Sequence, residues 1–152
     1  MADRQDQIPT LNSLIATLID SINGYEDAAA HAEASRFQQI FRDRAGERQR
    51  VVEDLRAEVR RLGGEPEAGG SFIGATHQRW LDLKAAITGR DDKAIINEVE
   101  RGEDYLKQNF ETALSSDRLS GDSRTVVERA YQSVRSGHDQ ISQLKHGLEA
   151  SS

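Results

Sequence analysis

Glu103 is the side chain whose place in the sequence raises the first chemical question. Read as a helix, the stretch 95–114 places six apolar residues on one stripe: Ile95, Ile96, Val99, Leu106, Phe110 and Ala113. Glu103 falls within that stripe, and Glu100 lies on its flank. A carboxylate on a buried face needs a partner, because an unpaired buried charge is costly. The groups on other helices that meet Glu103 therefore define the candidate site.

The composition limits the chemistry that is available. The 152 residues include no cysteine, which excludes disulfides and thiolate metal sites. Charged residues make up 30% and aromatic residues 5%, a profile that favours helices over sheets. The net charge of −6 argues against general nucleic-acid binding, and no apolar run is long enough to span a membrane. The N-terminal residues lack the apolar core of a signal peptide. We therefore expect a soluble protein of cytoplasmic type, with neither a nucleic-acid nor a membrane partner.

Apolar periodicity and helix-terminal residues predict five helices in one domain. We expect a flexible N-terminus over residues 1–9, followed by a helical domain over residues 10–149. The predicted helices begin at Thr10 or Asn12, at Ser35, at Ser71, at Asp91 or Asp92, and at Asp122 or Ser123. The first ends between residues 31 and 35 and the second near residue 62, before two glycines. The third is short and ends at residue 89, with Trp80 expected against the bundle, and the fourth ends near residue 116.

The lengths of the connections predict how these helices are arranged. The first and second helices have a tight connection, and so do the two last ones. A long segment that contains the short helix separates the second helix from the fourth. Two antiparallel hairpins joined by one long crossover are the ferritin-like arrangement of a four-helix bundle, and an up-down-up-down bundle would not need that crossover. The sequence thus predicts an all-α, ferritin-like four-helix bundle.

Counting from the two turns indicates which residues meet halfway along this bundle. The expected middle layer contains Leu18, Arg48 with Val51, Glu103, and Arg135 with His138. Arg44 lies about one helical turn from Arg48. Glu26 and Glu100 are either surface carboxylates or the partners of Arg44 in a second polar layer.

Three sequence runs resemble those of a known family: RRLGGEPE (residues 60–67), THQRWLDLKAAITG (residues 76–89) and ERGED (residues 100–104). The family is an uncharacterised bacterial one of ferritin-like four-helix-bundle proteins that carry a domain of unknown function. The resemblance extends from about Leu11 to Leu148. It implies the bundle fold and a bacterial source, and it does not specify a reaction.

The chain departs sharply from the metal-binding pattern of this fold. In ferritin-like di-iron proteins, two helices each supply a Glu and two supply a Glu-x-x-His. The first Glu-x-x-His corresponds here to Arg48 and the three residues after it, and the second to Arg135–His138. The lone Glu of the first helix corresponds to Leu18, so only Glu103 and His138 keep side chains that bind metals. Two guanidinium groups, which cannot lose their charge, stand where bridging carboxylates are needed and disfavour a cation.

Two functional hypotheses follow. The first is a non-enzymatic bundle that takes no cofactor and acts as a structural or protein-interaction module. Its former metal level is then a polar core, made of Arg48, Glu103, Arg135 and His138. Such a bundle is also able to form a homo-oligomer through its helix faces.

The second hypothesis belongs to a different class. It is a metal-binding protein, iron-handling or similar to di-iron oxidoreductases, with a displaced and incomplete ligand set. The ligands would come from Glu26, Glu100, Glu103 and His138. The sequence favours the non-enzymatic role and does not decide between the two.

Overall fold

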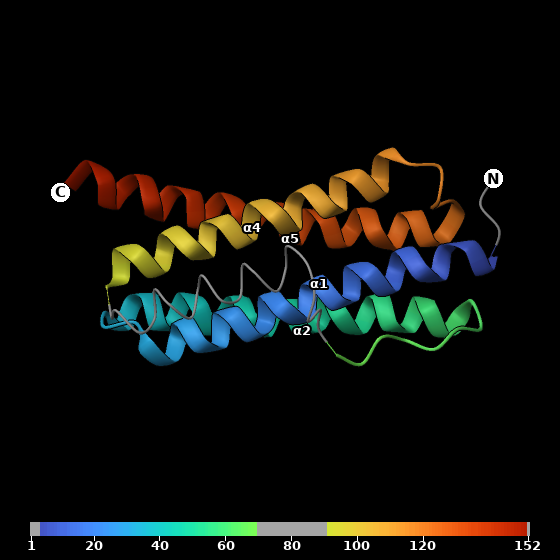
Figure 1. Ribbon diagram of the computed structural model, residues 1–152, viewed down its shortest axis with the longest axis horizontal. Coiled ribbons are helices and arrows are strands. Elements are labelled where there is room, and N and C mark those ends of the chain that lie inside the picture. The colour runs from blue at the N-terminus through green and yellow to red at the C-terminus, as the bar shows by residue number, and fades with distance from the viewer. Residues whose placement is uncertain (1–3, 70–90, 152) are drawn as a thin grey trace.

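The computed structural model describes residues 4–69 and 91–151, and these form four helices (Figure 1). They are α1 (Arg4–His31), α2 (Ser35–Arg61), α4 (Asp92–Ser115) and α5 (Gly121–Ser151). Helix α1 packs along α2 and α4 packs along α5, so the chain forms two antiparallel hairpins. The hairpins meet where α1 lies beside α4 and α2 lies beside α5. The predicted all-α four-helix bundle is confirmed.

Helix α1 begins earlier than the sequence predicts. It starts at Arg4 rather than at Thr10 or Asn12, and it contains Pro9. Two tertiary contacts hold the extra turn: the side chain of Gln7 accepts a hydrogen bond from the backbone N–H of Ser120 at 3.0 Å, and Ile8 packs against the backbone at Gly64. Pro9 has no N–H to donate within the helix, and these two contacts offset part of the stability that is lost there.

The turn between α1 and α2 falls where length alone placed it, between His31 and Ser35. The N-cap residue of α2 is Ala34, whose side chain makes no capping hydrogen bond. The carboxylate of Asp92 instead accepts hydrogen bonds from the backbone N–H groups of Glu33 and Ala34, at 2.8 and 3.0 Å. The first residue of α4 therefore holds the turn between α1 and α2, and this contact joins the two hairpins at one end of the bundle.

Helix α2 ends at a glycine in the left-handed conformation. Gly63 has φ of 86°, and the N–H of Gly64 donates to the carbonyl of Val59 at 2.9 Å, as in a Schellman motif. Beyond it, the side chain of Asn12 donates to the carbonyl of Glu65 and accepts from the N–H of Glu67. These two bonds attach the first part of the crossover to α1. The predicted short helix over residues 71–89, with Trp80, lies outside the described residues.

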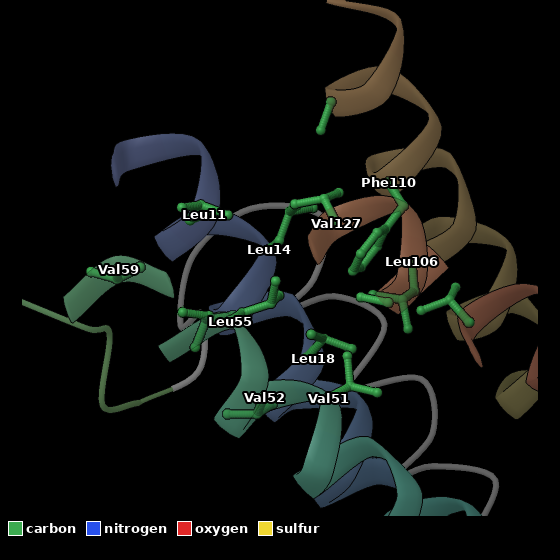
Figure 2. Close-up of a cluster of buried hydrophobic side chains, with 14 of the residues drawn as sticks. Leu11, Leu14, Leu18, Val51, Val52, Leu55, Val59, Leu106, Phe110 and Val127 are labelled. Carbon is green, nitrogen blue, oxygen red and sulfur yellow. The ribbon is translucent and has the colours of Figure 1, made fainter. Parts of the chain in front are cut away.

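The hydrophobic core consists of two clusters stacked along the bundle. The first, here called the Leu18 cluster, contains Leu11, Leu14, Leu18, Val51, Leu55, Leu106, Phe110 and Val127 among others. In Figure 2 its side chains come from all four helices and point into the space between them. The second, here called the Phe41 cluster, includes Tyr25, Phe37, Phe41, Ile95, Ile96 and Ile141. Full burial of each large apolar side chain contributes about 1.5–3 kcal/mol to stability.

Candidate functional site

A layer of polar residues separates the two hydrophobic clusters. On all four helices the members of one cluster end at this level and those of the other begin. The residues at this level, here called the polar layer, are Ser21 and Tyr25 of α1, Arg48 of α2, Glu103 of α4 and Gly137 of α5. This layer is the candidate site, because buried charges in an apolar core need a specific reason to be there.

Arg48 and Glu103 form a two-armed ion pair at the centre of the layer. Nη1 of Arg48 donates to Oε1 of Glu103 at 2.8 Å, and Nη2 donates to Oε2 at 2.7 Å. The two residues are 0% and 2% exposed. Nη1 also donates to the hydroxyl of Ser21 at 2.8 Å. The sequence placed these two charges opposite each other, and the structure joins them with the geometry that makes Arg–carboxylate pairs strong.

Electrostatics keep the guanidinium of Arg48 charged. Burial on its own lowers the pKa of Arg48, but the charge and hydrogen bonds of Glu103 outweigh it and raise that pKa above the usual value of a guanidinium. The guanidinium also lies 5.6 Å from the centre of the Tyr25 ring, within cation–π range. Burial, and next the charge of Glu103, raise the pKa of the Tyr25 hydroxyl well above its ordinary value, so it stays neutral. The layer therefore pairs the charged guanidinium of Arg48 with the carboxylate of Glu103, beside a neutral Tyr25 hydroxyl.

Gly137 makes room for the guanidinium. A Cβ atom at this position would overlap Nη2 of Arg48 and would lie 3.1 Å from Cδ of Arg44. Only a glycine on α5 lets both arginine side chains lie against the backbone of that helix. Gly137 was not predicted from the sequence as part of the site.

The seam between α2 and α5 continues the polar layer on one side. Arg44 is 9% exposed and donates to the side chains of Glu47, at 2.9 Å, and Gln140, at 2.6 Å. The other oxygen of Glu47 accepts a short hydrogen bond from the hydroxyl of Ser133. These contacts tie the two helices together beside the ion pair.

Two residues predicted for the middle layer lie elsewhere. Arg135 is exposed, and His138 lies at the edge of the bundle with a side chain that is 18% exposed. Nε2 of His138 is 2.6 Å from Oδ1 of Asp104 on α4, and Nδ1 is 3.2 Å from Oδ1 of Asp139. Burial lowers the pKa of His138, but the hydrogen bonds to Asp139 and Asp104 outweigh it and raise that pKa. His138 thus links α4 to α5 and does not reach the Arg48–Glu103 pair.

The predicted second polar layer is not formed either. Glu26 is exposed on α1, and Glu100 binds Lys145 of α5 at 2.9 Å. Arg44 turns toward the α2–α5 seam instead of toward these carboxylates. Leu18, expected in the middle layer, lies inside the Leu18 cluster. The helix period gave the correct level for several residues and the wrong direction for others.

The residues present do not fit the di-iron centre that some ferritin-like proteins contain. Both oxygens of Glu103 accept hydrogen bonds from Arg48, and the remaining candidate ligand His138 is bound to other carboxylates. Within the described residues, no group of three or more His, Cys, Asp or Glu side chains is arranged to hold a metal ion. The four residues of the displaced ligand set, Glu26, Glu100, Glu103 and His138, are not brought together.

Comparisons with known proteins agree with this architecture. The family described as "Domain of unknown function (DUF2383)" matches residues 6–116. No curated protein matches the chain. One solved structure is a two-domain protein from Anabaena variabilis, with DJ-1/ThiJ/PfpI-like and ferritin-like domains. It aligns over 99% of this chain with a TM-score of 0.75 and 14% identity. This chain covers 39% of that protein, and the likeness shows the fold, a ferritin-like bundle.

None of the helices among residues 4–69 and 91–151 combines the length and the apolar character that a membrane span requires.

Proposed function

We propose a role from the polar layer, because this chain belongs to the family described as Domain of unknown function (DUF2383) and that description states no role. The protein is a non-enzymatic, metal-free ferritin-like bundle that acts as a structural or protein-interaction module. It works in the bacterial cytoplasm, without a cofactor, and its helix faces mediate contact with other protein chains, including copies of itself.

The ion pair between Arg48 and Glu103 is the observation that supports this proposal. Both oxygens of the carboxylate that a metal centre would need are occupied by a guanidinium, at 2.8 and 2.7 Å. A divalent ion bound there would have to lie beside a permanent positive charge, which Coulomb repulsion opposes, or displace that charge and lose its attraction to Glu103. The side chains of the layer are thus suited to holding helices together and not to binding a metal.

Metal analysis tests the metal-free part of the proposal. We expect protein purified without chelator to contain substoichiometric metal, and titration with Fe(II) or Zn(II) to leave the melting temperature unchanged. A ligand that binds the folded state must raise its stability by mass action, so a bound ion would raise the melting temperature. One tight equivalent per chain that is lost in His138→Gln or Glu103→Gln would overturn the proposal in favour of a displaced metal site.

Light scattering coupled to size-exclusion chromatography tests the interaction part. We expect a mass above that of the 16.9 kDa chain at micromolar concentration, or a shift to a larger mass on addition of a bacterial partner. A protein that stays monomeric at every concentration, and in which cross-linking in cells finds no partner, would refute an interaction role.

A further inference from the structure

Two buried polar atoms in the polar layer lack a hydrogen-bond partner. They are Nε of Arg48 and the hydroxyl oxygen of Tyr25, and among the described residues only Oδ1 of Asn97 shares this condition. Arg48 is 0% exposed and Tyr25 is 2% exposed, so bulk solvent reaches neither atom. Leaving a donor of a charged group unsatisfied costs more than leaving a neutral one, and such atoms in folded proteins usually meet an ordered water.

The protein offers no obvious acceptor for the Nε proton. Nη1 donates to Glu103 and Ser21, and Nη2 donates to Glu103. Nε is the one nitrogen of this guanidinium that has no hydrogen-bond partner. On α5 the layer is formed by Gly137, which has no side chain. The clusters on either side of the layer are made mainly of aliphatic and aromatic groups. The acceptor must therefore come from outside the side chains of the layer.

The carboxylate of Glu103 has lone pairs to spare. Each of its oxygens accepts one hydrogen bond from Arg48, and a carboxylate oxygen can accept two. The Tyr25 hydroxyl lies near the carboxylate of Glu103, whose charge and hydrogen bonding both raise the pKa of that hydroxyl, but their geometry falls short of a full hydrogen bond. The layer thus combines an unsatisfied donor on Arg48, a weakly bonded hydroxyl and free acceptor capacity on Glu103. A water molecule, which both donates and accepts and usually makes about three hydrogen bonds in a protein interior, matches this set.

We propose that the polar layer contains a binding site for one ordered internal water, which accepts a hydrogen bond from Nε of Arg48. The water donates to the free lone pairs of Glu103 or to the Tyr25 hydroxyl. It is part of the folded structure, and the ion pair is a hydrated pair enclosed between two dry clusters.

Nuclear magnetic resonance tests this site in the intact protein. The Nε–H of Arg48 should give a slowly exchanging signal with a cross-peak to water, while the exposed Arg50 serves as the control whose Nε–H exchanges rapidly. Hydroxyl protons of Tyr25 and Ser21 could relay magnetisation from solvent. The variant Tyr25→Phe with Ser21→Ala removes both, and we expect the cross-peak to persist in it.

Each other outcome contradicts the site. Loss of the cross-peak in the double variant would mean that a hydroxyl group, and no water, is the partner of Nε. An Nε–H signal too rapidly exchanged to observe would mean that the layer is open to solvent. If the double variant does not fold, a high-resolution crystal structure of the unmodified protein decides. Density for a water within hydrogen-bond distance of Nε supports the site, and a protein acceptor there overturns it.

Discussion

The strongest test of the polar layer is a double-mutant cycle on Arg48 and Glu103. The variants are Arg48→Met, Glu103→Leu and the two combined, each chosen to replace a charge with an apolar side chain of similar volume. Either single change leaves the remaining charge buried without its partner, since the two residues are 0% and 2% exposed. The double change removes both charges and leaves an apolar layer continuous with the two clusters.

The burial and geometry of the pair give the expected magnitudes. Breaking a buried pair by removing one partner typically costs about 3–5 kcal/mol, whereas replacing the whole pair with apolar residues is neutral or stabilising by about 1–4 kcal/mol. With a slope near 2 kcal/mol per molar urea, a loss of about 4 kcal/mol moves the unfolding midpoint down by about 2 M. The double variant should unfold near the wild-type midpoint or above it.

A matched pair on the surface provides the control. Arg101 and Glu98 are the same residue types on α4, 3.1 Å apart, with side chains 57% and 18% exposed. Arg101→Met, Glu98→Leu and their combination should each change stability by less than about 1 kcal/mol, and the two effects should add. If the effects at Arg48 and Glu103 also add, the two charges do not depend on each other. Arg48 and Glu103 would then not be energetically coupled partners in the polar layer.

Three further predictions on neighbouring features, one of them with a control variant, are tested by urea unfolding. Gly137→Ala should destabilise by about 1–3 kcal/mol because its Cβ overlaps the buried guanidinium. Gly46→Ala, where nothing lies within 4 Å, should stabilise α2 by up to about 1 kcal/mol. Equal changes in stability in the two alanine variants would contradict the close fit of the guanidinium against Gly137. His138 has a raised pKa, so its contribution is complete below pH 6.5 and is lost as pH rises through the folded value. His138→Gln should abolish that decline, and an unchanged pH profile would show that the ion pairs of His138 contribute nothing. Ser123→Ala should cost about 1–3 kcal/mol, because Ser123 donates to the buried carboxylate of Glu58 at 2.5 Å. Hydrogen bonds from Arg61 and Ser123 lower the Glu58 pKa, so its contribution is lost on acidification below pH 4.5. If Ser123→Ala loses as much stability on acidification as the wild type does, Ser123 does not help to lower the pKa of Glu58.

Local signals in the sequence were enough for much of the fold. Gly63 and Gly64 end α2 in the way that glycine pairs do, and Asp91 caps α4 by accepting from the N–H of Lys93. The start of α1 was missed because Pro9 indicates a helix boundary when only neighbouring residues are considered. The contacts that extend the helix, such as Gln7 with Ser120, join segments far apart in the chain. No local pattern reports such contacts.

The site illustrates the same limit at the level of single residues. Glu103 was identified because it interrupts an apolar stripe and Arg48 because it lies at the same level of the bundle, and the structure joins them. On α5, counting from the turn reached the correct level but selected Arg135 and His138. Successive residues of a helix are rotated by about 100°, so a residue one position away already faces a different direction. Gly137 is in phase with the buried Val134 and Ile141, three residues after one and four before the other. That spacing was present in the sequence, but a glycine carries no apolar signal.

The position of the ion pair indicates why a bundle keeps charges in its core. Arg48 belongs to the α1–α2 hairpin and Glu103 to the α4–α5 hairpin, and apolar clusters of similar composition lie on both sides of them. A slip of one hairpin by one helical turn, about 5.4 Å, would keep apolar residues against apolar residues but would separate the two charges. Separation costs several kcal/mol in an apolar core, so the pair selects a single axial alignment of the hairpins. The double variant Arg48→Met with Glu103→Leu should therefore stay stable while populating more than one alignment, seen as doubled or broadened amide signals near the layer. A single, well-dispersed set of amide signals from that variant would mean that side-chain packing alone sets the alignment.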